Sequence, residues 1–125
     1  MMKTVQEIMT KDVATIDPHA TVAEAIQRMR DRQVGSLLVE QVSPSDTWGI
    51  ITQTDVVQKI VASGKDPERV EIADVMSKPV TTVRPDAVLP ECARLMARDH
   101  IRRVFVFDGR KIVGVVSASD IFRTL

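Results

Sequence analysis

The sequence is nearly free of cysteine. Cys92 is the only cysteine in 125 residues, which excludes an intrachain disulfide and any zinc site built on pairs of thiolates. Cys92 lies on an apolar helical face, so we expect it to be buried; a redox role would need an exposed thiol beside a cation. Neither His19 nor His100 has a second histidine or a carboxylate at ligand spacing, and we expect no metal site.

The sequence also lacks an excess of charge and any long apolar run. Its 17 basic and 17 acidic residues cancel, and no run of like charge stands out, so we expect no nucleic-acid partner. No stretch approaches the ~20 apolar residues of a membrane span. The first seven residues lack the apolar core of a signal peptide. We therefore expect a cytoplasmic protein with no membrane contact.

What the sequence does contain is an internal repeat. The stretch 5–55 reappears in the same order as the stretch 72–120. Eight landmarks recur at a constant shift of 67 residues: Met9, Lys11, Val13, Thr15, Pro18, Ala20, Glu24 and Met29 become Met76, Lys78, Val80, Thr82, Pro85, Ala87, Glu91 and Met96. Such a repeat predicts two copies of one unit packed together, with function at the seam between them. We place the copies at 5–64 and 72–125, joined by a polar linker at 65–71.

Each copy has the same predicted order of elements. A short amphipathic turn precedes a strand, a helix, two further strands and a final helix. The expected turns are 5–9 and 72–76, the first strands 13–16 and 80–83, the first copy's helix 21–29, the strand pairs 36–39 with 49–51 and 104–107 with 113–116, and the final helices begin at Asp55 and Asp120. The fold class is therefore α+β, a mixed α/β fold of two pseudo-symmetric units.

Several local signals support these boundaries. Thr21 with Glu24 has the spacing of a capping box, and Pro90 with Glu91 suits the first turn of the equivalent helix. The pair Asp108-Gly109 predicts a hairpin turn, where the first copy has a longer polar loop at 42–47. Trp48 follows that loop, and we expect it to pack at the end of a strand; it could instead cover an adenine ring or a partner surface.

Two seven-residue segments, 49–55 and 114–120, share one pattern. Each has Gly, two apolar residues, Thr or Ser, two variable residues and Asp. Together with the duplicated element order and the openings 8–10 and 75–77, they resemble a tandem pair of cystathionine-β-synthase (CBS) domains, also called a Bateman module. The resemblance covers essentially the whole chain and implies two β-α-β-β-α units.

The resemblance also implies a ligand. Paired CBS units form clefts between them that commonly hold adenosine-containing molecules: AMP, ADP, ATP, S-adenosylmethionine or a dinucleotide such as NADH. Asp55 and Asp120 would accept hydrogen bonds from ribose hydroxyls, and Thr52 and Ser117 would meet a phosphate. The adenine edge would be read by the main chain at Val13, Ala14, Val80 and Thr81, with Val34 and Ile101 packing nearby.

The most informative difference between the two copies lies at Arg102 and Arg103. They replace Gly35 and Ser36 of the first copy. In similar proteins basic residues here reach a nucleotide phosphate, and a guanidinium matches phosphate oxygens geometrically. Two arginines before a strand could equally be a solvated edge that discourages aggregation. The asymmetry predicts that the two clefts differ in affinity.

Simple helix capping is the alternative explanation for the Thr52–Asp55 and Ser117–Asp120 pairs. The sequence has no nucleophile with a base and no phosphate loop, so we expect no enzyme activity. Our primary hypothesis is an adenine-nucleotide sensor that acts as a homodimer, as the resemblance implies, on an unidentified effector protein in trans. The alternative is a ligand-independent scaffold, and a nucleotide-processing enzyme comes third.

Overall fold

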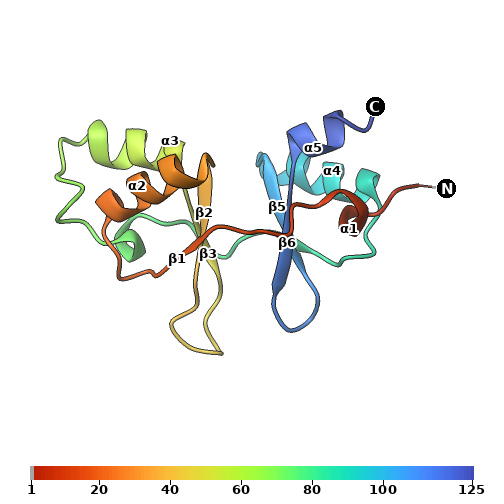
Figure 1. Cartoon of the computed structure of the whole chain (residues 1–125), viewed down its shortest axis with the longest axis horizontal. Coiled ribbons are helices and arrows are strands. Elements are labelled where there is room, and N and C mark those ends of the chain that lie inside the picture. The colour runs from red at the N-terminus through yellow and green to blue at the C-terminus, as the bar shows by residue number, and fades with distance from the viewer. Residues whose placement is uncertain (1) are drawn as a thin grey trace. The chain divides into compact units, whose positions relative to one another are not determined.

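The structure, a computed structural model, describes residues 2–125 (Figure 1). It contains two compact units, and one of them is built from two separate parts of the chain. The Ala14–Val80 unit is continuous, whereas the Thr81–Leu125 unit also includes the N-terminal segment as far as Val13. Each unit has one three-stranded sheet with its own helices, which confirms the predicted mixed fold of two similar units.

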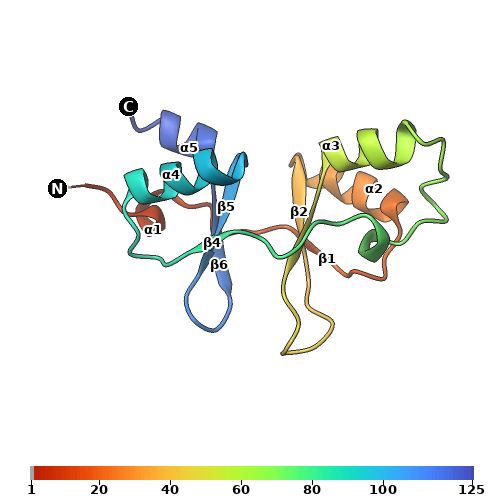
Figure 2. The same ribbon diagram turned by 180° about the vertical axis from the view of Figure 1, so that it is seen from behind.

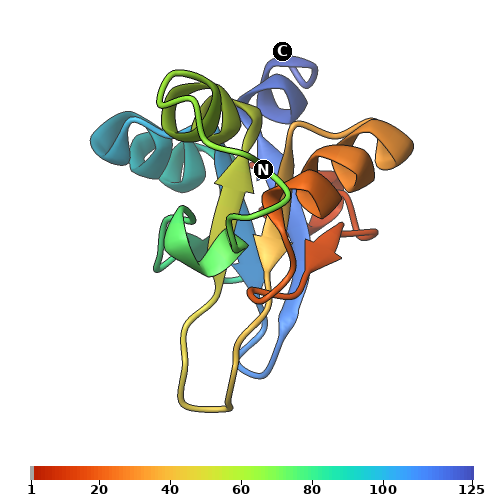
Figure 3. The ribbon, with the colours of Figure 1, turned by 90° about the vertical axis from the view of Figure 1, so that its left-hand side faces the viewer.

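The Ala14–Val80 unit has the strand order β1-β2-β3. Strand β1 (Thr15–Ile16) pairs in parallel with β2 (Ser36–Val39), which pairs antiparallel with β3 (Gly49–Thr52). Helix α2 (Val22–Arg32) makes the crossover that a parallel pair needs. Helix α3 (Gln53–Asp55) continues as a π-helix (Val56–Val61), and a 3₁₀ turn (Ile72–Asp74) follows. The loop between β2 and β3 extends well beyond both strands (Figure 3).

The Thr81–Leu125 unit repeats this plan. Strand β4 (Thr82–Val83) lies parallel to β5 (Arg103–Phe107), and β5 pairs antiparallel with β6 (Ile112–Ser117) (Figure 2). Helices α1 (Val5–Ile8), α4 (Leu89–Asp99) and α5 (Ala118–Phe122) complete it. The Asp108-Gly109 turn is confirmed, because Gly109 has a φ of 100° and Asp108 Oδ1 accepts the N–H groups of Arg110 and Lys111. These donors lower the pKa of Asp108.

Helices α2 and α4 bury the apolar faces that their sequences predict. Val22, Ala25 and Met29 of α2 lie in one core, and Leu89, Cys92 and Met96 of α4 lie in the other. Burial raises the pKa of the Cys92 thiol, and the side chain has no exposed area, so the predicted packing role is confirmed. Thr21 accepts the N–H of Glu24, one half of the expected capping box, and Pro90 lies in the first turn of α4.

Both of these helices end in a way that the sequence did not indicate. The C-cap residues Gln33 and His100 have left-handed backbone conformations, with φ of 54° and 55°. Glycine is the usual residue at such a position, and neither copy has one there.

The opening segment of each copy belongs to the unit that carries the other copy's strands. Thr10 pairs with Val115 in one unit, and Ser77 pairs with Ile50 in the other. Val5 of α1 donates a hydrogen bond of 2.8 Å to the carbonyl of Ala87. The predicted copies 5–64 and 72–125 therefore describe the repeat in the sequence, whereas the compact units exchange the segments 5–13 and 72–80 between copies.

Candidate functional site

A carboxylate and a hydroxyl form a reciprocal pair where β3 meets α3. Thr52 Oγ1 accepts the N–H of Asp55 at 3.0 Å, and Asp55 Oδ2 accepts the N–H of Thr52 at 2.9 Å. The strand ends at Thr52 and the helix starts at the next residue, so both groups satisfy backbone donors that the helix leaves open. The capping role is therefore realised, and it uses only one of the two carboxylate oxygens of Asp55.

The same pair recurs where β6 meets α5. Ser117 Oγ accepts the N–H of Asp120 at 3.1 Å, and Asp120 Oδ2 accepts the N–H of Ser117 at 2.8 Å. The side chains of Asp55 and Asp120 are 16% and 15% exposed. Both carboxylates are thus held by the backbone in a partly buried position, with access to solvent.

The second oxygen of each carboxylate faces a cation. Oδ1 of Asp55 lies 3.3 Å from Nζ of Lys59, and Oδ1 of Asp120 lies 2.5 Å from a terminal nitrogen of Arg123. These cations are far more exposed than the carboxylates, at 42% and 69%. The sequence reasoning missed both, although their spacing of four and three residues on one helix was the available signal. A ribose hydroxyl that approached either carboxylate would meet this oxygen and its cation.

Arg102 and Arg103 lie beside the Ser117–Asp120 pair, in the same unit. The carbonyl of Arg102 accepts the N–H of Ala118, the first residue of α5, at 2.8 Å, and Arg103 is opposite Ser117 in the sheet register. The backbone is alike in the other unit, where the Gly35 carbonyl accepts the N–H of Gln53 and Ser36 is opposite Thr52. The two junctions therefore share a geometry and differ in charge.

The residues expected at the adenine edge are divided between the units. Ala14 and Val80 belong to the Ala14–Val80 unit, whereas Val13 and Thr81 belong to the other. The carbonyl of Ala14 accepts the N–H of Leu38 at 2.9 Å, and the carbonyl of Thr81 accepts that of Phe105 at 3.0 Å. One lone pair of each of these two carbonyls is therefore already used to hold the neighbouring strand.

Val34 and Ile101 occupy equivalent places after the two left-handed caps. Each is partly buried against the core of its own unit, and each donates a hydrogen bond of 3.0 Å to the last turn of the preceding helix. In the chain, each residue lies between the end of a helix and the strand that carries Ser36 or Arg103.

Thr81 takes part in a polar cluster that the sequence did not indicate. Its hydroxyl donates to Asp99 Oδ2 at 3.2 Å, and Arg98 donates to both oxygens of Asp99 at 2.8 and 3.0 Å. The hydrogen bonds from Arg98 are the main reason that the pKa of Asp99 is lowered. The residue equivalent to Asp99 in the other copy is Arg32, so the repeat did not indicate that Asp99 belongs to a polar cluster.

The two histidines and Trp48 were also singled out in the sequence. Within residues 2–125, no three His, Cys, Asp or Glu side chains gather as they would around a metal ion. Trp48 is half-buried at the start of β3, and its carbonyl accepts the N–H of Val80 at 3.2 Å. No helix within residues 2–125 is long and apolar enough to cross a membrane.

The family model described as CBS domain matches residues 5–62 and again residues 72–125. The chain belongs to the CBS domain family. A CBS domain pair is a regulatory module. The predicted resemblance is therefore confirmed over both copies of the repeat.

Similar proteins and structures agree with this assignment. An uncharacterized protein of Methanopyrus kandleri is 38% identical over 95% of the chain, and the chain spans 61% of that relative's length. The hexameric CBS-CP12 protein from bloom-forming cyanobacteria is 40% identical, with a TM-score of 0.92 over 98% of this chain and 67% of its own. A candidate signal-transduction protein with CBS domains from Burkholderia ambifaria has a TM-score of 0.87 at 27% identity, over 98% of this chain and 93% of its own.

Proposed function

We propose that this CBS pair senses an adenosine-containing nucleotide, such as AMP, ADP, ATP or S-adenosylmethionine, and regulates a partner protein in trans. The observation that supports the proposal is the duplicated carboxylate at Asp55 and Asp120. In each, the backbone holds one oxygen while a solvent-accessible side chain pairs with the other. A rigid carboxylate with an exchangeable partner is suited to accept a hydrogen bond from a ribose hydroxyl.

We infer that the phosphate end of the nucleotide binds to the Thr81–Leu125 unit. Arg102 and Arg103 stand beside Ser117 there, whereas the other unit has Gly35 and Ser36 at these places. Guanidinium groups offer several donors to phosphate oxygens. We therefore infer that nucleotides with phosphate bind more tightly at Asp120, and that the site at Asp55 favours a ligand held mainly through its nucleoside.

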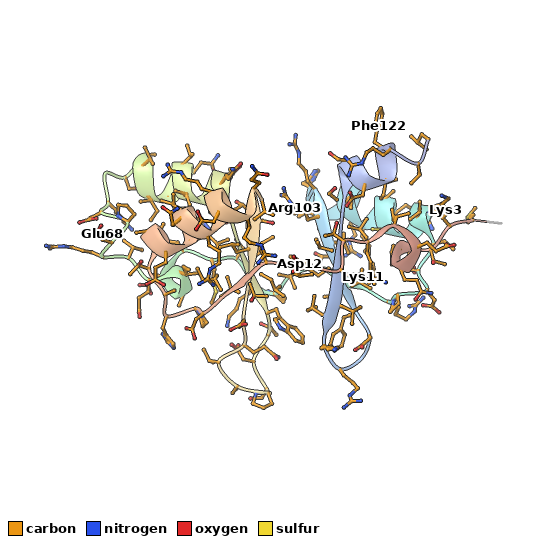
Figure 4. The ribbon with its side chains drawn as sticks, viewed as in Figure 1. Lys3, Lys11, Asp12, Glu68, Arg103 and Phe122 are labelled. Atoms are coloured by element: carbon orange, nitrogen blue, oxygen red, sulfur yellow. The ribbon has the colours of Figure 1, made fainter. Side chains whose placement is uncertain are left out.

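Self-association as a homodimer is part of the proposal. Val57 and Val61 are 58% and 67% exposed on the π-helix Val56–Val61 of one unit, and Phe122 is 74% exposed on α5 of the other. Phe122 projects outward from α5 (Figure 4) and stands at the position equivalent to Val57. Exposed apolar side chains at equivalent places suit a self-complementary contact between two copies.

The test is a thermal-shift series on the purified protein with AMP, ADP, ATP, S-adenosylmethionine and NADH. A ligand present at ~100 times its Kd should add about 2.7 kcal/mol, which raises the Tm by several degrees. Asp120→Asn should abolish the shift with a phosphate-bearing nucleotide while the unliganded Tm changes little. The asparagine oxygen can still accept the N–H of Ser117, so the helix cap is retained.

Asp86→Asn is the matched control, because Asp86 is an exposed carboxylate of the same unit that lies outside the proposed site. It should leave the shift intact. If no member of the series moves the Tm and no nucleotide copurifies with the protein, the carboxylates act only as helix caps and the protein is a ligand-independent scaffold. Chromatography of each nucleotide after incubation would detect turnover, which an enzyme would show and a sensor would not.

A further inference from the structure

Lys59 connects two parts of the Ala14–Val80 unit that are distant in sequence. Its ammonium lies 3.3 Å from Oδ1 of Asp55, on the same helical run, and donates a hydrogen bond of 2.8 Å to the carbonyl of Val75. Asp55 is the proposed ribose residue, whereas Val75 follows the 3₁₀ turn Ile72–Asp74. One side chain thus contacts both the candidate ligand group and the opening segment of the second copy.

That opening segment is attached to the strand that leads to Asp55. Met76 lies against Gly49 at the start of β3, and the N–H and carbonyl of Ser77 are hydrogen-bonded to Ile50 at 3.0 and 2.9 Å. Strand β3 continues directly into Thr52 and Asp55. Lys59 therefore closes a ring of contacts that runs from Asp55 along β3 to Ser77 and back through Val75.

The other unit does not repeat this arrangement. The position equivalent to Lys59 is Thr124, whose hydroxyl donates to the carbonyl of Ile121 on its own helix. The cation beside Asp120 is instead Arg123, at the position of Gln58. The helices also differ: Val56–Val61 is π-helical, whereas α5 is α-helical. Single π-helical turns occur often at functional sites.

We propose that Lys59 transmits the state of Asp55 to the segment Ile72–Ser77. While the carboxylate of Asp55 is unoccupied, it holds the Lys59 ammonium near the Val75 carbonyl. When an amide replaces the carboxylate, or when a ribose hydroxyl donates to Oδ1, Lys59 loses its anchor and gains rotamer freedom. The hydrogen bond to Val75 is then formed for less of the time, and the segment opens more often. The part that concerns ribose rests on the proposed function; the coupling between Asp55 and the segment does not.

The test is amide hydrogen exchange, measured residue by residue by NMR, at Met76 and Ser77. Asp55→Asn should raise exchange at both amides about two- to fivefold, the range expected for loss of a partly exposed ion pair. Lys59→Met should raise it to a similar extent, and the double variant should exchange no faster than Lys59→Met alone. Arg123→Met is the matched control, and it should leave the equivalent amides of Met9 and Thr10 unchanged.

Two results would overturn the coupling. One is unaltered exchange at Met76 and Ser77 in Asp55→Asn; the other is a full effect of Asp55→Asn in a protein that already carries Lys59→Met. A second arm adds millimolar S-adenosylmethionine, the proposed ligand without a phosphate, which should raise exchange at these amides in the unmodified chain but not in Lys59→Met. Absence of nucleotide binding would reject the proposed function and leave the mutational comparison to decide the coupling. Binding at Asp55 without a change at Ser77 would reject the coupling and retain the proposed function.

Discussion

Met9 lies directly against Gly114, although the two residues come from different copies of the repeat. A Cβ atom at position 114 would overlap the sulfur of Met9 and would be 2.7 Å from Cγ and 3.1 Å from Cβ of that side chain. Met76 and Gly49 make the reciprocal contact, where a Cβ atom would be 2.8 Å from the sulfur of Met76. These pairs explain in physical terms why both seven-residue motifs begin with glycine: the opening methionine of one copy occupies the space of the missing side chain.

The first prediction concerns this close contact. Gly114→Ala should lower the free energy of unfolding by about 1–3 kcal/mol, because the added methyl overlaps both the sulfur and Cγ of Met9 and lies close to its Cβ. Gly49→Ala should cost less, since only the sulfur of Met76 lies within 3.0 Å there and the carbonyl oxygen of Ser77 is 3.2 Å away. Urea unfolding measures both. In a Met9→Ala background the cost of Gly114→Ala should largely disappear; an equal cost in both backgrounds would contradict the packing explanation.

The second prediction concerns acid. A hydrogen bond from Lys78, followed by backbone donors at Val42 and Thr47, lowers the pKa of Asp46 from 3.8 to about 2. Because the folded pKa is depressed, Asp46 stabilises the fold above its unfolded value, and this contribution is lost as the pH falls towards about 2. The difference in Tm between the unmodified chain and Asp46→Asn should be full at about pH 5 and should vanish near pH 2.

Comparison with Asp46→Asn isolates this group, since Asp99 and Asp108 also have lowered pKa values. In a Lys78→Met background, Asp46→Asn should change the Tm little at every pH, because the hydrogen bond that mainly lowers the pKa of Asp46 is then absent. Added salt should reduce the difference, since the Lys78 side chain is 37% exposed. A difference in Tm that stayed constant between pH 5 and pH 2 would show that Asp46 stabilises the loop without its charge.

The third prediction separates the two explanations of Arg103. If its guanidinium contacts a phosphate, Arg103→Gln should weaken AMP binding about tenfold or more, the usual loss for a hydrogen bond to a charged group, and leave adenosine binding nearly unchanged. Isothermal titration calorimetry with both ligands measures this. Arg110→Gln, in the β5–β6 turn, is the control. An equal loss for AMP and adenosine would indicate a structural role for Arg103 at the edge of the site.

The fourth prediction concerns oligomeric state. Light scattering at micromolar concentration should give the mass of a dimer, and Phe122→Ser should shift the equilibrium towards monomer, because it removes the largest exposed apolar side chain of α5. Val57→Ser should act in the same direction through the equivalent position. Val42→Ser, in the β2–β3 loop, is also an exposed apolar truncation and should have no effect. A monomeric mass for the unmodified chain would reject self-association.

Features that depend on a few neighbouring residues could be predicted from the sequence. The apolar spacing of Val22, Ala25 and Met29 indicated α2, and Asp108-Gly109 indicated the β5–β6 turn. The S/T-x-x-D spacing indicated the caps at Thr52 and Ser117, since the donor and acceptor are three residues apart and meet wherever the helix starts. The left-handed caps at Gln33 and His100 could not be predicted in this way, because neither of these positions carries a glycine.

The sequence by itself determined the family, the duplicated unit and the residues at each helix start, because these follow from repetition and short-range spacing. It did not determine which copy each opening segment packs on. Met9 and Met76 are equivalent, and so are Gly49 and Gly114, so the pattern allows either pairing. Only the tertiary structure decided that the segments are exchanged, that Lys59 reaches Val75 and that Thr81 reaches Asp99. Each of these contacts joins residues distant in the chain, and the path of the backbone between them, not any local preference, brings them together.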